Sequence, residues 1–260
     1  MLYYAARLNK TVLYVGCCGW CMGRSRYYAA FNVVELQDTF YDPPDPERLS
    51  RLASEAPEGF AFAMKAWQAV THPLDSPTWK RAKRRPDSSL AGRYGFLRPT
   101  REVLEAWDLV ARAARALRAS VVVVQTPPSF GYSEENFRNA VEFFRSAETR
   151  EFWVGWEPRG SWLENPEGVA EVVSRFDRVV HVVDPFRARP AVEREVVYYR
   201  LHGIGGGEVN YRYKYTDEDL RRLAELVKPH LEARRSVYVL FNNVYMAQDA
   251  ARFREVAARL

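Results

Sequence analysis

The 260-residue sequence contains few cysteines, few lysines and no long hydrophobic run. Its three cysteines, Cys17, Cys18 and Cys21, lie too close together to form a disulfide framework that ties distant segments. The longest uncharged stretch, 119–133, contains two prolines and is shorter than the ~20 residues that a membrane-spanning helix needs. Two basic residues interrupt the weakly apolar first ten positions, which is not the pattern of a signal peptide. We therefore expect a soluble, cytoplasmic protein without a membrane partner.

Apolar and aromatic residues make up 47% of the chain, and charged residues make up 27%. This composition excludes a disordered chain and allows a large buried core. Only six of the 38 basic residues are lysine, and such a predominance of arginine is typical of a GC-rich genome or of a thermophile. The length fits one large domain or two small ones, since single barrels reach this size.

The formal net charge of +5 comes from one segment. Residues 79–101 hold eight basic residues and one acidic residue, whereas the rest of the chain is slightly acidic. One interpretation is a solvated, mobile loop that supports solubility. The other is an anion-binding flap for phosphates or nucleic acid, with Trp79, Tyr94 and Phe96 available for stacking. The basic residues expected to contact nucleic acid are Lys80, Arg81, Lys83, Arg84 and Arg85.

Eight short segments rich in β-branched and apolar residues recur along the chain and are bounded by turn residues. Most are apolar at successive positions, as strands buried on both faces should be. Helical patterns with N-cap signals lie between them. The predicted strands are 12–16, 33–37, 60–65, 121–125, 152–156, 179–183, 196–201 and 237–241.

This alternation of strands and helices predicts an α/β fold, a single TIM-type (β/α)8 barrel domain that spans residues 1–260. Two connections depart from the regular pattern. The third contains the long basic insertion, about 73–100, and the sixth, 184–195, is irregular, being too short and too rich in proline and arginine for an ordinary helix. The alternative is an open doubly wound sheet, but the glycines at 205–207 do not match its nucleotide-binding fingerprint.

Polar residues gather where the predicted strands end, which is where TIM-type barrels carry their chemistry. Three acidic and three basic residues of this set balance one another. A structural ion-pair network is one explanation, but buried ion pairs contribute little stability. Paired charges also suit a polar ligand such as a phosphate, a carboxylate or a sugar, so we favour a site. The balanced set is Glu35, Glu157, Asp184, Lys65, Arg159 and Arg200.

Seven motifs cover almost the whole chain. They are GCCGW (16–20), FNVVELQDTFY (31–41), FAFAMKAWQAVTH (60–72), QTPPSF (125–130), WEPRGSW (156–162), YYRLHG (198–203) and VLFNNVYMAQDA (239–250). In this order they resemble the YecE-like family, which is the domain of unknown function 72. The resemblance implies a TIM-type barrel and supplies no reaction. The matching positions that it implies at the barrel rim are Glu35, Thr39, Tyr41, Lys65, His72, Gln125, Glu157, Arg159, His202 and Asn242.

The sequence departs from the pattern of this family in three places. Gln37 stands where asparagine is usual, and Cys17 and Cys18 replace small or hydroxyl residues. Asp249 replaces a common asparagine in the last helix. The first two departures bear on ligand choice, and none changes the expected fold.

The preferred interpretation is an enzyme, a hydrolase or a lyase, that acts on a phosphorylated or other anionic substrate without a required cofactor. A carboxylate acts as general base, a histidine or lysine acts as general acid, and an arginine holds the anion. Alternatively, Lys65 forms a Schiff base with a carbonyl substrate. The predicted catalytic residues are Glu35, Lys65, Glu157 and His202, and the predicted substrate-binding residues are Trp20, Thr39, Tyr41, His72, Gln125, Arg159, Arg200 and Asn242.

Three other interpretations stay open. A divalent metal would make the protein a phosphodiester hydrolase, although nearby basic residues repel a cation and no His-x-His or Glu-x-x-His cluster occurs. Cys18 and Cys21 have CxxC spacing, typical of redox chemistry or half a metal site, but no second pair occurs and we favour a structural role. A protein without enzymatic activity would bind nucleic acid through the insertion and stack bases on Trp20, Trp79 and Trp162. The metal ligands would be Glu35, Glu157, Asp184 and His202.

Overall fold

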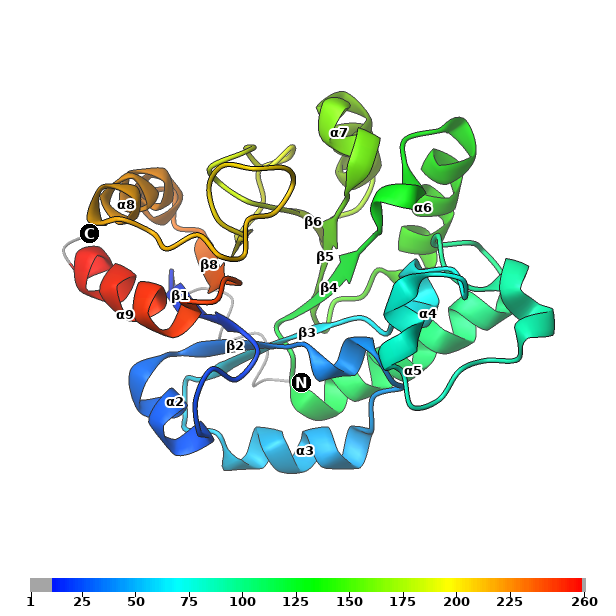
Figure 1. Cartoon of the computed structure of the whole chain (residues 1–260), viewed down its shortest axis with the longest axis horizontal. Coiled ribbons are helices and arrows are strands. Elements are labelled where there is room, and N and C mark those ends of the chain that lie inside the picture. The colour runs from blue at the N-terminus through cyan, green and yellow to red at the C-terminus, as the bar shows by residue number, and fades with distance from the viewer. Residues whose placement is uncertain (1–10, 259–260) are drawn as a thin grey trace. The chain divides into compact units, whose positions relative to one another are not determined.

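The computed structural model describes residues 11–258 (Figure 1). Eight parallel strands follow one another in chain order and close into a barrel. Helices alternate with the strands, so the predicted TIM-type (β/α)8 barrel is confirmed. The strands are β1 (Leu13–Cys18), β2 (Val33–Leu36), β3 (Ala61–Lys65), β4 (Val121–Gln125), β5 (Trp153–Glu157), β6 (Val179–Val183), β7 (Val196–Leu201) and β8 (Ser236–Phe241).

Most of the longer helices begin at N-cap residues that the sequence supplies. Thr100 Oγ1, for example, accepts the backbone N–H of Val103 at the start of α5. As predicted, the connection 184–195 contains no helix. Within residues 11–258, no helix combines the length and the apolar character needed to span a membrane. The helices are α2 (Arg24–Ala30), α3 (Pro46–Glu55), α4 (Gln68–Thr71), α5 (Arg101–Leu117), α6 (Glu134–Ala147), α7 (Pro166–Ser174), α8 (Asp217–Glu232) and α9 (Met246–Ala257).

Two strands extend further than the sequence predicted. β1 continues to Cys18 instead of ending at residue 16, and β5 includes Glu157. Parallel pairing accounts for both extensions, because Cys18 pairs in register with Glu35 of β2 and Gln125 of β4 pairs with Glu157. Regular strand backbone therefore fixes the positions of these polar residues.

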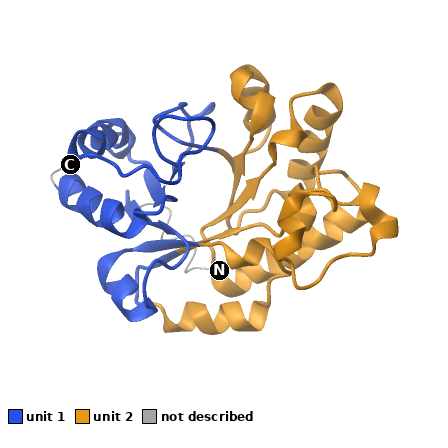
Figure 2. Ribbon diagram, in the orientation of Figure 1, with its two compact units in different colours: residues 1–35, 57–61, 182–260 blue, residues 36–56, 62–181 orange. Residues whose placement is uncertain are grey.

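The chain divides into two compact units, which Figure 2 colours separately. Unit 1 comprises Met1–Glu35, Pro57–Ala61 and Val182–Leu260. It contains β1, β7, β8 and most of β2, and α9 packs against β1 and β8. Gly16 allows β1 to approach β2 closely, since a Cβ at this position would lie 1.9 Å from the Val33 carbonyl oxygen.

Unit 2 comprises Leu36–Ala56 and Phe62–His181. Four successive valines of β4 are buried, as expected for a strand covered on both faces. Helix α5 packs against α3 and buries Val103, Trp107 and Val110 on its inner face. These side chains form the apolar core from which the polar strand ends of this unit project.

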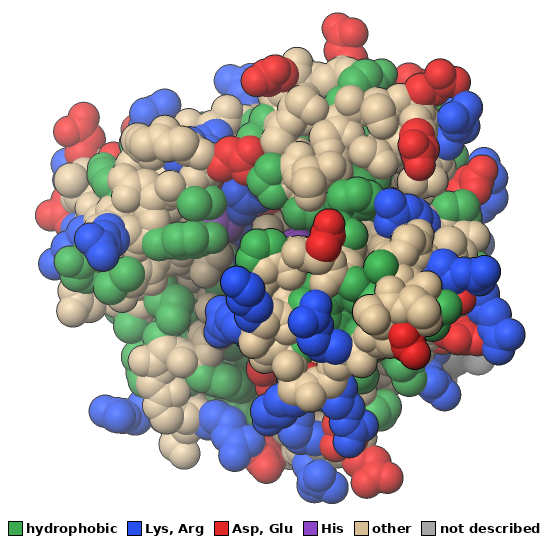
Figure 3. Space-filling view, turned by 45° about the vertical axis from the view of Figure 1, so that its right-hand side comes forward, with side chains coloured by type: hydrophobic (Ala, Val, Ile, Leu, Met, Phe, Trp, Pro, Cys, Tyr) green, Lys and Arg blue, Asp and Glu red, His purple; other side chains and the backbone are tan. Residues whose placement is uncertain are grey.

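The basic segment is anchored to unit 2 through two short 3₁₀ helices, η2 (Pro77–Arg81) and η3 (Ser88–Arg93). Trp79 is fully buried, so the prediction that it is available for stacking is wrong. Asp42 Oδ1 accepts the backbone N–H groups of residues 83 (2.8 Å) and 84 (3.1 Å). Figure 3 shows several Lys and Arg side chains close together at the surface. The exposed basic side chains of this segment include Lys80, Arg81, Lys83, Arg84 and Arg85.

Candidate functional site

Glu35 and Arg200 form a buried ion pair in unit 1. Arg200 Nη2 lies 3.0 Å from Glu35 Oε1, and the two side chains are 1% and 0% exposed. Tyr198 precedes Arg200 by two residues on β7 and therefore faces the same side. Its hydroxyl donates to Glu35 Oε2 at 2.8 Å. Burial and the charge of Glu35 raise the pKa of Tyr198 well above its ordinary value, so this phenol stays a hydrogen-bond donor at neutral pH.

Asp184 and His202 meet at the ends of the neighbouring strands β6 and β7. Asp184 Oδ2 accepts the backbone N–H of His202 at 3.0 Å and lies 4.0 Å from its Nδ1. His202 is buried, and its ring packs edge-on against the ring of Tyr211 with the centroids 6.0 Å apart. Tyr211 itself is exposed. A carboxylate at this distance stabilises the positive charge that an imidazole acquires on accepting a proton, so the pair is suited to proton transfer.

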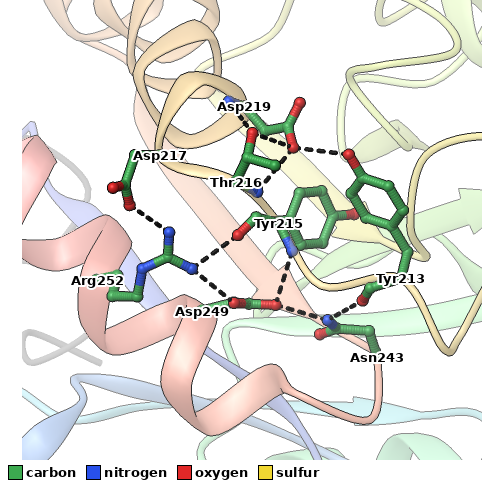
Figure 4. A network of polar contacts seen from close by, with 8 residues as sticks. All are labelled: Tyr213, Tyr215, Thr216, Asp217, Asp219, Asn243, Asp249 and Arg252. Carbon is green, nitrogen blue, oxygen red and sulfur yellow. Dashed lines mark hydrogen bonds and ion pairs between the residues drawn. The ribbon is translucent and has the colours of Figure 1, made fainter.

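A polar network holds the segment that follows His202 (Figure 4). The Tyr215 hydroxyl oxygen accepts the backbone N–H of Gly203 at 2.8 Å. The backbone N–H of Tyr215 in turn donates to Asp249 Oδ2 at 3.3 Å. Asp249 is fully buried, and Arg252 balances its charge from 3.1 Å. Asp249 of α9 therefore helps to position the loop that carries His202.

Asn243 belongs to this network, although the sequence analysis selected its neighbour Asn242. Asn243 Nδ2 donates to the Tyr213 carbonyl oxygen at 2.8 Å and to Asp249 Oδ2 at 2.7 Å. Its buried Oδ1 has no hydrogen-bond partner within the part of the chain that the structure describes. Asn242 is half-buried, and its backbone N–H donates to Leu201 of β7 at 2.9 Å. The two adjacent asparagines and the unusual Asp249 were the sequence signals for this network.

Glu157 and Arg159 form a second buried ion pair, which lies in unit 2. Arg159 Nη2 lies 2.5 Å from Glu157 Oε1, and each side chain is only 7% exposed. The register partner of Glu157 is Gln125, which is half-buried at the end of β4. Burial lowers the pKa of His181 on β6 to about 4, and the nearby charge of Glu157 opposes part of this effect. His181 is therefore neutral at physiological pH.

Lys65, Thr39 and His72 meet around one aromatic ring of unit 2. Lys65 Nζ lies 4.0 Å from the ring centroid of Phe40, and the His72 ring packs edge-on against the same ring at 4.9 Å. Thr39 Oγ1 donates to the Lys65 carbonyl oxygen at 2.7 Å. Burial, together with the charge of Lys65, lowers the pKa of His72 to about 3. Phe40, which is not among the predicted site residues, is the ring that Lys65 and His72 share.

Tyr41 connects the segment after β2 to the basic segment. The Arg81 guanidinium lies 4.0 Å from the centroid of the Tyr41 ring. Gln68 Nε2 donates to the Tyr41 carbonyl oxygen at 2.9 Å. Gln68 is fully buried, and among residues 11–258 its Oε1 finds no hydrogen-bond partner. The predicted binding residue Tyr41 is thus already engaged by one of the exposed arginines of η2.

The tryptophans predicted to stack on bases differ in accessibility. Trp162 is fully buried and stacks on Phe130 with the ring centroids 6.1 Å apart, so the prediction for Trp162 is wrong for the same reason as that for Trp79. Trp20 is half-buried and packs edge-on against Tyr27 at 4.9 Å. Of the three rings, Trp20 alone retains partial exposure.

The two cysteines whose sulfurs are in contact are not the two that have CxxC spacing. Cys21 Sγ lies 3.6 Å from the Sγ of Cys17, so its sulfur partner is Cys17 and not Cys18. Within the described range, no group of three or more His, Cys, Asp and Glu side chains is arranged to hold a metal ion.

The family model described as protein of unknown function DUF72 matches residues 14–260. The fold is similar to the crystal structure of a DUF72 family protein from Enterococcus faecalis, with 19% identity, a TM-score of 0.72 and coverage of 97% of this chain and 99% of that chain. For a DUF72 family protein from Thermotoga maritima the identity is 24%, the TM-score 0.66 and the coverage 95% and 99%. Endonuclease IV from Thermus thermophilus shares the fold with 14% identity, a TM-score of 0.55 and coverage of 95% and 100%. No curated protein matches the sequence. Because the family match extends over nearly the entire sequence, the chain belongs to the DUF72 family.

Proposed function

We propose that the chain is an enzyme that acts on a phosphorylated or other anionic small molecule by acid/base chemistry at the C-terminal ends of its strands. The Asp184–His202 pair, two residues along the chain from Arg200, is the observation that supports this proposal most. An imidazole beside a carboxylate is a common proton-transfer pair in enzymes. A guanidinium two residues away offers the planar fork that binds phosphate and carboxylate groups.

The proposal assigns a role to each residue of this cluster. His202 transfers the proton, and Asp184 orients its backbone and stabilises the charged ring. Arg200 holds the anionic group of the substrate, while Glu35 and Tyr198 fix the side chain of Arg200. Tyr211, which is 46% exposed and packs on the His202 ring, moves aside to admit the substrate.

Unit 2 carries a second, separate set of candidate residues, for which the predicted roles are proposed. Glu157 is assigned as a general base, Lys65 as a general acid and Arg159 as an anion-binding residue. The close pairing of Glu157 with Arg159 supports this assignment, because a buried pair contributes little stability by itself.

A turnover screen against phosphate monoesters, combined with calorimetric titration of inorganic phosphate, tests the proposal. His202→Gln should lower turnover of any accepted monoester by about 100-fold or more, which is the usual contribution of acid/base catalysis. The same variant should change the affinity for inorganic phosphate less than about twofold, since the binding group is Arg200. His230→Gln is the matched control, because His230 lies on α8 and contacts Tyr199. Absence of phosphate binding and of turnover, or unchanged turnover in His202→Gln, would overturn the proposal.

Nucleic-acid binding is the second candidate function, and the anchored basic segment favours it. Five basic side chains between residues 80 and 85 are exposed, and Asp42 holds the backbone between η2 and η3. With Trp79 and Trp162 buried, binding would depend on phosphate contacts and would therefore fall steeply with salt.

Anisotropy of a labelled single-stranded oligonucleotide, titrated from about 50 to 200 mM salt, tests this candidate. Replacing the five basic residues at 80, 81 and 83–85 by glutamine should reduce the slope of log affinity against log salt by about 0.7 for each lost phosphate contact. Arg221→Gln with Lys228→Gln on α8 is the control and should leave the slope unchanged. A salt-independent affinity, or an equal loss in the control, rules this function out.

A further inference from the structure

Two cysteine sulfurs of unit 1 lie in contact on the outer side of β1. Cys17, at the end of the strand, is fully buried, whereas Cys21, in the loop before α2, is half-buried. The distance between their Sγ atoms is 3.6 Å. Cys17 Sγ also lies 3.5 Å from the carbonyl oxygen of Met246, the first residue of α9.

Cys18 lies on the other face of the strand. Side chains alternate along β1, so Cys18 points away from the side of Cys17 and Cys21. Cys18 pairs in register with Glu35 and is close enough to Tyr198 to raise the pKa of that phenol. Cys18 is therefore on the opposite face of β1 from the Cys17–Cys21 pair.

The two paired thiols differ in acidity. The hydrogen bond between the sulfurs and the burial of Cys17 raise the pKa of the Cys17 thiol. The same hydrogen bond lowers the pKa of Cys21. Cys21 is the more exposed sulfur and the one that loses its proton more readily, and the thiolate is the nucleophilic form of cysteine. Cys17 remains a protonated thiol within reach of it.

We propose that Cys17 and Cys21 form a redox-active pair that reduces peroxides, with Cys21 as the attacking sulfur and Cys17 as the resolving one. The Cys21 thiolate attacks one peroxide oxygen, the O–O bond breaks, and the leaving hydroxide or alkoxide takes a proton from water. Cys21 is then a sulfenic acid. Cys17 gives up its proton and attacks Cys21 Sγ, so that an S–S bond forms, the S–O bond breaks and water leaves.

The electrons balance, because two thiols are oxidised to one disulfide while one peroxide is reduced to water or to an alcohol and water. A small dithiol reductant restores the pair by thiol–disulfide exchange. The sulfur–sulfur distance must fall from 3.6 Å to about 2.0 Å in the disulfide. Movement of Cys21 supplies this change, since Cys21 lies in a loop. Cys17 is held in a strand, and its backbone N–H donates to the Tyr27 hydroxyl oxygen at 2.8 Å.

Differential labelling of the reduced, full-length chain tests the pairing. After treatment with hydrogen peroxide, the protein is unfolded in urea while its free thiols are alkylated with iodoacetamide; it is then reduced and labelled with N-ethylmaleimide. Trypsin releases residues 11–24 as one peptide that contains all three cysteines, and fragmentation locates each label. We expect maleimide on Cys17 and Cys21 and iodoacetamide on Cys18. Maleimide on Cys18, or iodoacetamide on all three at excess peroxide, would overturn the proposal.

Peroxide consumption by single variants tests the assigned roles. Cys18→Ser is the matched control and should consume peroxide and form the disulfide as the natural chain does. Cys21→Ala should reduce the consumption rate by about tenfold or more, because the thiolate is lost. Cys17→Ala should leave Cys21 to proceed to sulfinic acid, a gain of two oxygen atoms in mass. Disulfide formation in Cys17→Ala, or unchanged peroxide consumption in Cys21→Ala, contradicts the assigned roles of the two sulfurs. If a variant does not fold, labelling of the natural chain still decides which cysteines pair.

Discussion

His72 makes the folded protein sensitive to mild acid. Its side chain is 5% exposed and packs between the Phe40 ring and Thr71, whose Oγ1 lies 2.7 Å from His72 Nδ1. Burial is the main reason that its pKa falls from 6.5 to about 3, and the charge of Lys65 adds to the effect. The folded state therefore keeps His72 neutral at a pH at which the unfolded chain protonates it.

The sign and the size of the effect follow from proton linkage. Between pH 6.5 and about 3 the unfolded chain binds more protons at this residue than the folded chain, so stability falls as the pH falls. Each pH unit in this window costs about 1.4 kcal/mol. From pH 8 to pH 5 His72 should therefore cost about 2 kcal/mol. His181, whose pKa falls to about 4 through burial, should add a similar amount over the same range.

Urea unfolding at pH 8 and pH 5 measures this loss. His72→Gln removes the titrating group and retains a polar side chain, so the drop in unfolding free energy should be about 2 kcal/mol smaller than in the natural chain. His181→Gln is the matched variant and should reduce the drop by a similar amount, and the double variant by about 4 kcal/mol. The comparison uses the change with pH, so any general destabilisation by the substitution cancels. An identical pH dependence in His72→Gln and the natural chain would refute the reasoning.

Two further predictions concern unit 1. Gly16→Ala places a Cβ 1.9 Å from the Val33 carbonyl oxygen and should destabilise the protein by about 3 kcal/mol in thermal unfolding. Gly23→Ala is the control, because a Cβ at Gly23 has no atom within 4 Å. Equal unfolding midpoints for the two variants would contradict the close approach of β1 and β2. Arg200→Met and Glu35→Gln should each cost about 3–5 kcal/mol, while the double variant should cost less than the sum of the two, since removing both partners leaves no unbalanced charge. A strictly additive double variant in urea unfolding would show that the two side chains do not interact.

The sequence was sufficient to predict the barrel because its strands and helix starts carry local signals. The valine run of β4 indicates a strand buried on both faces, and Thr100 and Thr216 are N-caps of α5 and α8. The irregular sixth connection was likewise predicted from its proline and arginine content and its length. The strand ends were less accurate: β1 runs two residues further than predicted, because register with β2, which no local pattern encodes, decides where pairing stops.

The partners of individual side chains were harder to predict. Trp79 and Trp162 were expected to be available to bases, yet both are fully buried. A large ring next to a basic run, as at Trp79, can equally serve as the anchor of that run, and Trp162 is buried against Phe130. Cys21 pairs with Cys17 although the spacing to Cys18 matches a known motif, because strand alternation turns Cys18 to the other face. Which side chains come into contact depends on the direction in which each one points. In a loop, the spacing of residues along the sequence does not determine that direction.

The buried ion pairs constrain how an anionic substrate could be recognised. Arg200 already contacts Glu35 at 3.0 Å, and in unit 2 Arg159 contacts Glu157 at 2.5 Å. An anion that binds either guanidinium must therefore share it with a carboxylate or displace that carboxylate. Sharing is unfavourable when both groups carry negative charge at short distance in a site with little water. An anionic substrate would thus favour uptake of a proton at the binding step. The affinity for inorganic phosphate should therefore rise as the pH falls, and the rise should exceed the effect of the change in the charge of phosphate itself.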